Sequence, residues 1–169
     1  AAATAPEVDL TFFVDCLPAD GFRGPAVLVN PPDSNGPLTR EERRGDASTW
    51  TIVAPDDPLM SHLARAAVHV ASYPVFQAGP VATVLATSAE GDPLVVRYAA
   101  TGGPRAAVLF DIQRANTEWA MQPSFVIFWA NCVSTLAAAA PTSPGYGPVN
   151  VWEELVGQVQ KKYQQLRSL

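Results

Sequence analysis

The pattern of apolar and polar positions predicts a sheet that begins with two strands buried on both faces. Residues 9–15 combine aromatic and β-branched side chains and lead into a turn at residues 18–21, which is typical of a strand. Residues 25–30 form a second apolar run, which ends at Pro31 and Pro32. Continuous apolar runs of this kind are typical of parallel strands, because other layers cover both of their faces.

The next stretch is polar and irregular. Residues 31–48 contain Thr39 and Glu42 at the spacing of a capping box, which predicts one helical turn before Gly45. A short strand is expected over residues 50–54, where the apolar character returns.

After a short expected helix at residues 59–67, the apolar period changes to two and predicts four short strands. These strands cover residues 68–75, 82–87, 94–99 and 106–111. Hairpin-like connections at residues 88–93 and 101–104 join the last three of these strands. Since a parallel pair needs a crossover of about a dozen residues or more, neighbouring strands in this stretch must be antiparallel.

A buried helix is expected from Pro123 onward, with Pro141 at its end. Its apolar residues lie nearly all round the helix, which favours burial. The longest apolar stretch, residues 125–140, is shorter than the roughly 20 residues that span a bilayer. We expect four of its side chains to be buried and Asn131 to bond a neighbouring strand end or loop. The four are Phe125, Ile127, Phe128 and Leu136.

The last part of the chain divides by composition into a linker and a second helix. Residues 141–148 are rich in proline and glycine, and they separate a domain over residues 1–140 from residues 149–169. Asn150 is a capping residue, and the apolar side chains after it form one helical stripe. The stripe either docks on the chain's own domain or binds a partner, for example a second copy in a homodimer.

Composition limits the classes of protein to which the chain belongs. Its 169 residues suit one domain, or two at most. Its composition, with 48% apolar and 16% charged residues, excludes a disordered chain. The low charge density indicates a surface that a protein partner, or the rest of a longer chain, partly covers. The net charge of −5 argues against binding to nucleic acid or to an anionic membrane. The chain begins with Ala and shows no signal-peptide pattern, so we expect a piece of a longer protein.

The sequence lacks the motifs that bind cofactors and metals, so we expect neither a cofactor nor a metal ion. It contains no glycine-rich phosphate loop, no zinc-protease motif and no nucleophile elbow. His62 and His69 stand seven residues apart without a second ligand pair, which argues against a zinc site. Cys16 and Cys132 are too few for a disulfide framework, and Cys132 lies in an apolar run where a thiol packs as a small hydrophobe.

Four polar residues stand at or near predicted strand ends, which is where open α/β sheets bind ligands. They are Asp15, Cys16, Asp111 and Asn116. A cleft there would support an enzyme, whereas the alternative is that the aspartates bond the backbone of their own turns. Cys16 makes a poor nucleophile, because its neighbours are bulky, the Asp15 carboxylate disfavours a thiolate, and no helix begins there.

Several phrases between about residues 8 and 137 resemble, in the same order, phrases of one family. The phrases are residues 10–18 (LTFFVDCLP), 27–32 (VLVNPP), 57–59 (DPL) with 68–70 (VHV), 92–96 (DPLVV), 106–111 (AAVLFD), and 116–119 (NTEW) with 122–131 (QPSFVIFWAN). In these phrases the chain resembles the class I glutamine amidotransferase-like domain of bacterial membrane proteins that contain a von Willebrand factor A domain, of the aerotolerance-operon (BatA) type.

The resemblance implies an α/β fold with a flavodoxin-like, amidotransferase-like sheet. Parallel strands would be followed by an antiparallel hairpin extension, helices would cover the faces, and the family's first βα unit would be missing before Asp9. The resemblance also implies loss of glutaminase activity. Class I amidotransferases use a Cys on a nucleophile elbow with a His and a Glu in a Phe-His-Pro-Glu phrase, and residues 110–113 (FDIQ) hold neither the His nor the Glu.

We therefore expect a non-catalytic interaction or scaffold domain of a bacterial cell-envelope protein, placed outside the cytoplasmic membrane. One alternative is a hydrolase or transferase of another class, with its site at the strand ends. Another is a small-ligand or carbohydrate-binding module. Exposed Trp50, Trp119 or Trp152 on a concave face would favour this second alternative, and buried tryptophans would count against it.

Overall fold

The computed structural model describes residues 10–63 and 66–137 of the chain. The strands are β1 (Thr11–Val14), β2 (Ala26–Val29), β3 (Leu38–Gly45), β4 (Ser48–Thr49), β5 (Thr51–Ile52), β6 (His69–Val70), β7 (Tyr73–Ala78), β8 (Ala82–Thr87), β9 (Pro93–Ala100) and β10 (Gly103–Val108). The helical elements are two 3₁₀ turns (Pro58–Met60 and Trp119–Met121), α1 (Pro123–Cys132) and a π-helical turn (Val133–Ala137).

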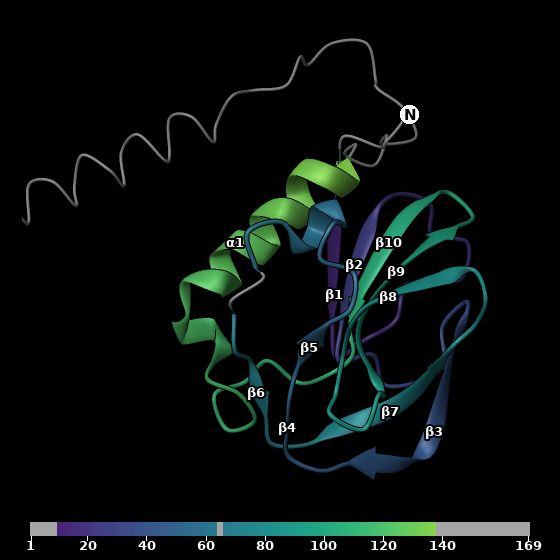
Figure 1. The fold of residues 1–169 in the computed structure, drawn as a ribbon. Helices are drawn as coiled ribbons and strands as arrows, with labels where there is room; N and C mark the ends of the chain where they lie inside the picture. Colours follow the sequence, from purple (N-terminus) through teal and green to yellow (C-terminus); the bar gives the residue numbers. More distant parts are fainter. Residues whose placement is uncertain (1–9, 64–65, 138–169) are drawn as a thin grey trace, which may run out of the picture.

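A six-stranded mixed sheet forms the centre of the fold, in the order β1-β2-β10-β9-β8-β5 (Figure 1). β1, β2 and β10 are parallel, whereas β9, β8 and β5 each run antiparallel to the strand before them in this order. The structure thus confirms a mixed α/β fold with a parallel part and an antiparallel extension. β10 belongs to both parts, because it pairs with β2 on one side and with β9 on the other.

The register of the parallel strands aligns their ends. Val14 of β1 lies opposite Val29 of β2, which in turn lies opposite Val108 of β10. The residues that follow these three valines therefore come to one end of the sheet. Arg105 lies opposite Ala26 and so marks the other end, where β2 and β10 begin.

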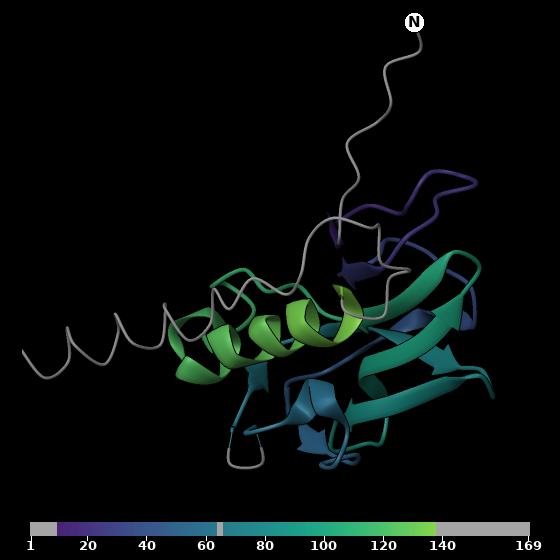
Figure 2. The same ribbon diagram turned by 90° about the horizontal axis from the view of Figure 1, so that it is seen from above.

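Two apolar clusters lie on the two faces of this sheet. Val27 and Val29 of β2 belong to the larger cluster, together with buried side chains of α1, and Ala26 and Leu28 belong to the smaller one. All four residues of β2 are buried, as the continuous apolar run predicted. Figure 2 shows α1 from above, lying along one side of the sheet.

The smaller cluster is covered by the strands β3 and β7 and not by a helix. These strands pair antiparallel, and their side chains Leu38 and Phe76 pack in the smaller cluster. The helical turn expected at residues 39–42 is wrong, as is the expectation of helices on both faces. β3 pairs with β7 at both of its ends, over Leu38–Arg40 and Arg44–Gly45, with an irregularity between them. This pairing outweighs a capping signal for a single helical turn, because an isolated turn is costly to form.

Tyr73 ties the β3–β7 pair to the β8–β9 turn. Its ring fills the space beside Gly45, so that a methyl group at Gly45 would overlap the ring. The Tyr73 hydroxyl donates to Asp92 Oδ2 at 3.1 Å, and Arg43 Nη2 donates to Asp92 Oδ1 at 2.7 Å. Burial raises the pKa of Tyr73 to about 12, since the phenolate would lose its hydration there.

The helix α1 packs on the larger cluster through Phe128, with Leu136 of the following π-helical turn buried beside it. Both burials were predicted, whereas Phe125 and Ile127, also predicted to be buried, are only half-buried. Asn131 bonds a neighbouring loop, as expected: its Nδ2 donates to the carbonyl oxygens of Leu59 and Ser61 at 3.2 and 2.9 Å.

The helix expected at residues 59–67 is largely wrong. A single 3₁₀ turn forms at Pro58–Met60, where the Asp57 side chain accepts a hydrogen bond from the Leu59 amide. His62 has a φ of 63°, a left-handed conformation that a continuing helix does not allow. The expected linker at residues 141–148 and the helix at residues 149–169 lie outside the described residues.

Replacing Phe128 by Ala should lower the free energy of unfolding by about 3–5 kcal/mol, because the side chain is fully buried against the sheet. Val126 lies on the same helix with 59% of its surface exposed, so Val126→Ala should change this free energy by less than about 0.5 kcal/mol. Urea unfolding followed by circular dichroism measures both. Equal losses in the two variants would contradict the packing of α1.

Candidate functional site

The sequence-predicted residues Asp15 and Cys16 lie directly after β1. The Asp15 carboxylate accepts a hydrogen bond from Asn30, whose Nδ2 lies 2.7 Å from Asp15 Oδ1. Both residues have left-handed backbones, with φ values of 54° and 47°, which Asp and Asn tolerate better than most residues. The backbone N–H of Asn30 also donates to the Val108 carbonyl oxygen at 2.8 Å. This pair therefore ties the carboxyl ends of the three parallel strands together.

Asn30 was not among the predicted site residues. Its position between the apolar run of β2 and Pro31 was a usable signal, because polar residues that follow parallel strands gather at one end of the sheet. Its hydrogen bond to Asp15 was not predictable, since that bond depends on the register between β1 and β2.

Asp111 and Asn116 form a second pair, which closes the loop after β10. Asn116 Nδ2 donates to the Asp111 carbonyl at 2.8 Å, and Asn116 Oδ1 accepts from the Ser72 amide at 3.0 Å. The Asp111 carboxylate accepts from the Gln113 amide at 2.9 Å. Both side chains thus bond the backbone of nearby loops, which is the alternative weighed for the aspartates.

The structure does not bring the four predicted residues into one cluster: Asn116 bonds Asp111, whereas Asp15 bonds Asn30 and not a second predicted residue. In the part of the chain that is described, no hydrogen bond joins Asp15 or Cys16 to Asp111 or Asn116. Cys16 is an exposed free thiol. His69 bonds the Thr49 hydroxyl at 2.6 Å in the β4–β6 pair. Asn116 and His69 line a shallow pocket of about 310 Å³.

Residues 110–113 stand where the amidotransferase phrase would carry its His and Glu. Phe110 is fully buried, with its ring centroid 5.8 Å from that of Trp119. Asp111 holds the local turn, as described above. Among the described residues, no hydrogen bond joins Asp111 to either cysteine.

Two tryptophans bear on the carbohydrate-binding alternative. Trp50 and Trp119 are 5% and 0% exposed, and their rings pack edge to face with centroids 5.1 Å apart. Buried tryptophans present no stacking platform to a sugar, so both count against this alternative. Trp152 lies outside the described residues.

The second cysteine is structural. Cys132 is the last residue of α1 and is buried, and both cysteines are free thiols. Burial raises the pKa of the Cys132 thiol to about 12, so this thiol stays protonated and packs as an apolar side chain.

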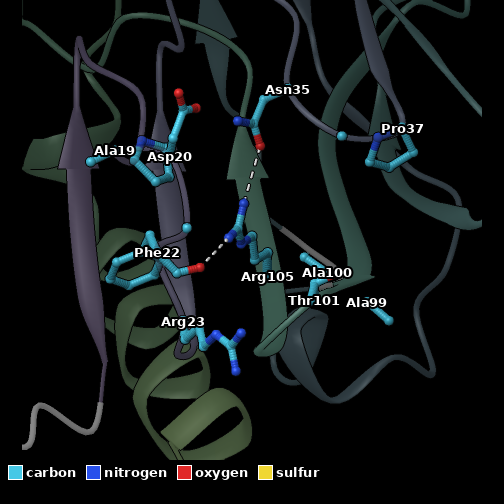
Figure 3. Close-up of a pocket in the computed structure, with 13 residues that line it drawn as sticks. Ala19, Asp20, Phe22, Arg23, Asn35, Pro37, Ala99, Ala100, Thr101 and Arg105 are labelled. Atoms are coloured by element: carbon cyan, nitrogen blue, oxygen red, sulfur yellow. Dashed lines mark hydrogen bonds between the residues drawn. The ribbon is translucent and has the colours of Figure 1, made fainter.

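A larger pocket of about 510 Å³ lies at the other end of the parallel strands (Figure 3). Three connections build its walls: the one between β1 and β2, the one between β2 and β3, and the β9–β10 hairpin. The lining residues are Pro18, Ala19, Asp20, Gly21, Phe22, Arg23, Asn35, Gly36, Pro37, Ala99, Ala100, Thr101 and Arg105.

Arg105 is the buried charged residue of this pocket, with only 9% of its surface exposed. Its Nη1 donates to Asn35 Oδ1 and its Nη2 to the Phe22 carbonyl, both at 3.4 Å. The guanidinium carbon lies 5.7 Å from the centre of the Phe22 ring. Figure 3 shows the guanidinium between Asn35 and Phe22.

The pocket depends on two glycines in the β9–β10 turn. A methyl group at Gly102 would come within 2.8 Å of the Arg23 Cα, and one at Gly103 within 2.8 Å of the Gly24 carbonyl carbon. Both glycines also have positive φ values, 99° and 153°. The turn therefore lies directly against the β1–β2 connection, which no side chain at these two positions would permit.

No motif or pattern in the sequence pointed to this pocket. Arg105 stands just before the apolar run of residues 106–110, and a charge at the start of a buried strand was the one available signal. Phe22 and Asn35 come from two irregular connections, and their positions next to Arg105 depend on the path of those connections in space.

Within residues 10–63 and 66–137, no three His, Cys, Asp or Glu side chains come together to hold a metal ion. No helix in the described part of the chain is long and apolar enough to cross a membrane.

No family model matches the sequence, and no curated protein matches it either. Solved structures that match the chain include the following three. Cytoplasmic Protein STM3548 from Salmonella typhimurium has a TM-score of 0.56 and 16% identity, over 68% of this chain and 55% of that one. Cytoplasmic Protein STM1381 from Salmonella typhimurium LT2 has a TM-score of 0.54 and 15% identity, over 68% and 56%. The exo-beta-1,4-mannosidase Op5Man5 from Opitutaceae bacterium strain TAV5 has a TM-score of 0.41 and 16% identity, over 72% and 21%.

These comparisons support the fold and correct one expectation. The chain spans about half the length of the two Salmonella structures, and at this identity the likeness concerns the α/β fold alone. Both structures are named cytoplasmic proteins, which contradicts the expected location outside the cytoplasmic membrane in a cell envelope. The mannosidase likeness is too weak to carry an argument.

Replacing Asn116 by Ala should lower the free energy of unfolding by about 1–3 kcal/mol, because the Ser72 amide and the Asp111 carbonyl would lose their partner. The exposed Gln113 side chain lies in the same loop, so Gln113→Ala should cost less than about 0.5 kcal/mol. Thermal and urea unfolding provide the comparison. A negligible loss in Asn116→Ala would show that this side chain is free for another role.

Proposed function

We propose that this chain is a non-catalytic interaction domain with a flavodoxin-like, amidotransferase-like sheet that lacks glutaminase activity. The observation that carries the proposal is the use of the polar side chains at the strand ends. Asp15, Asp111 and Asn116 each bond a neighbouring loop or strand end, so they act as parts of the scaffold. The parallel trio of β1, β2 and β10, and the sequence phrases that resemble the amidotransferase-like family, support the family assignment.

A hydrolase or transferase of another class is the alternative at this end of the sheet. Such an enzyme needs a nucleophile together with a base that is oriented by a third group. Cys16 is exposed, but the carboxylate beside it is already engaged by Asn30. The geometry of the described residues therefore favours binding over catalysis at this end.

An exposed apolar surface offers a place for a protein partner. Phe12 and Val14 of β1 are 44% and 50% exposed, and the Phe12 ring lies 5.6 Å from Trp129 of α1. Val126 and Val133 flank Trp129 at helical spacing and are 59% and 42% exposed. We refer to these five residues as the β1–α1 surface.

The partner that suits the β1–α1 surface is a second copy of the chain. β1 ends the sheet, and among the described residues no strand pairs with its outer edge. Its residues, Thr11–Val14, include neither charge nor proline, the usual protections of an edge strand. An uncharged edge can pair with itself antiparallel about a two-fold axis, which would bury Phe12 and Val14 in both copies.

The chain should release no ammonia from glutamine above the rate of a Cys16→Ala variant, because the thiol lacks an oriented base. A coupled glutamate dehydrogenase assay measures the rate, with a functional class I amidotransferase as positive control. Glutamine hydrolysis that is lost in Cys16→Ala would overturn the non-catalytic assignment.

Self-association should depend on the edge of the sheet. Val14→Lys places a charge on β1 and should shift the sedimentation coefficient from dimer to monomer, since a buried lysine at a paired edge is costly. Val81→Lys is the matched control, because Val81 is 69% exposed in the turn between β7 and β8, outside the β1–α1 surface. A wild-type chain that stays monomeric at all concentrations, or equal dimerisation of the two variants, would refute the second-copy assignment.

A further inference from the structure

We infer that the pocket around Arg105 binds the carboxylate group of a small organic acid. The pocket lies where β2 and β10 begin, at the opposite end of the parallel strands from Asp15 and Asn30. The inference is therefore separate from the proposed interaction surface, and it does not depend on it.

The first argument is the uncompensated charge of Arg105. A guanidinium stays protonated at any physiological pH, and burying a charge is costly unless a partner of opposite charge accompanies it. Arg105 is more than nine-tenths buried, yet both of its acceptors are neutral and stand at 3.4 Å, which is long for a hydrogen bond. Among the described residues its Nε has no acceptor at all.

No carboxylate of the described chain supplies this missing partner. The ion pairs of the described residues involve Arg43 and Arg97 but not Arg105. Asp20 lines the same pocket, but its carboxylate points away from Arg105 (Figure 3). The guanidinium therefore has no anionic partner among the described residues.

The second argument is the way in which Arg105 is held. Asn35 Oδ1, which accepts from Arg105, also accepts from the Tyr98 hydroxyl at 3.0 Å, so the amide is fixed from two sides. The Phe22 ring lies against the guanidinium, and the Phe22 carbonyl accepts from its Nη2. A charged group whose orientation is set before binding loses little freedom when the ligand arrives.

The composition of the pocket selects the class of anion. Arg23 and Arg105 against Asp20 leave one net positive charge, which suits a monoanion better than a phosphate dianion. The guanidinium is planar and matches a planar carboxylate. The remaining wall is largely apolar or small, with Pro18, Pro37 and Ala100 among its residues, which suits an apolar body attached to the carboxylate. The volume of about 510 Å³ is within the range of small-molecule sites.

The experiment titrates the full chain with benzoate and with 4-methylpentanoate, with sodium chloride used to keep the ionic strength constant. Isothermal titration calorimetry should give saturable binding to the wild type, and Arg105→Met should weaken it at least tenfold. Arg114→Met is the matched control, since Arg114 is exposed and lies in the loop after β10, away from the pocket, while the change in net charge is the same. Inorganic phosphate should bind more weakly than either carboxylate.

A second measurement needs no variant that removes the arginine charge. The Nε–Hε resonance of Arg105, assigned by its loss in Arg105→Lys, should shift on addition of benzoate while those of the other arginines stay in place. Arg105→Lys keeps the charge but loses the planar fork, so its carboxylate affinity should fall as well. The inference is overturned if the wild type shows no saturable binding, if Arg114→Met loses as much affinity as Arg105→Met, or if phosphate binds as tightly as the carboxylates.

Discussion

The pairing of β2 between β1 and β10 is the constraint on which the rest of this fold depends. β2 is only four residues long, and all four are buried, two on each face of the sheet. A strand of this kind needs a cover on both faces and a neighbour on both edges. α1 and the aromatic side chains around Trp119 cover one face, β3 and β7 cover the other, and β1 and β10 occupy the edges. Each of these elements comes from a different part of the chain.

Because the three parallel strands share one register, the two ends of the sheet have different chemistry. At the carboxyl ends, the side chains of Asp15, Asn30 and Asn116 bond neighbouring loops and strands, so they are largely satisfied within the protein. At the amino ends, a buried arginine has only neutral acceptors at long distance. Unsatisfied polar groups cost stability, and proteins retain them mainly where they serve a purpose. The pocket that we propose as a ligand site therefore lies at the end of the sheet opposite to the carboxyl ends, where α/β sheets usually bind ligands.

The interaction surface and the pocket use different physical properties of the same sheet. β1 ends the sheet without charge or proline, and with Trp129 and its neighbours on α1 it presents an apolar surface. The pocket instead depends on two adjacent glycines, Gly102 and Gly103, which allow the hairpin turn to touch the β1–β2 connection. The first property suits contact with a protein, and the second creates a cavity with polar groups held in place. The two proposed roles, binding of a protein and binding of a small molecule, therefore fall at separate places on the domain.

The sequence by itself determined much of the buried core, because apolar runs and their period report burial directly: β2, the antiparallel strand β9 and Phe128 agree with the pattern. β1 does not, because it forms the edge of the sheet and leaves Phe12 and Val14 about half exposed, so its expected burial on both faces is wrong. It also pointed to Asp15, Asp111 and Asn116 as residues at or near strand ends, but not to how they pair. Tertiary structure alone decided that residues 38–45 form a strand, because the partner that stabilises this polar segment, β7, lies almost thirty residues further along the chain. Tertiary structure alone also decided the hydrogen bond from Asn30 to Asp15 and the meeting of Phe22, Asn35 and Arg105 in one pocket. These contacts depend on strand register and on the path of irregular connections, and local periodicity encodes neither.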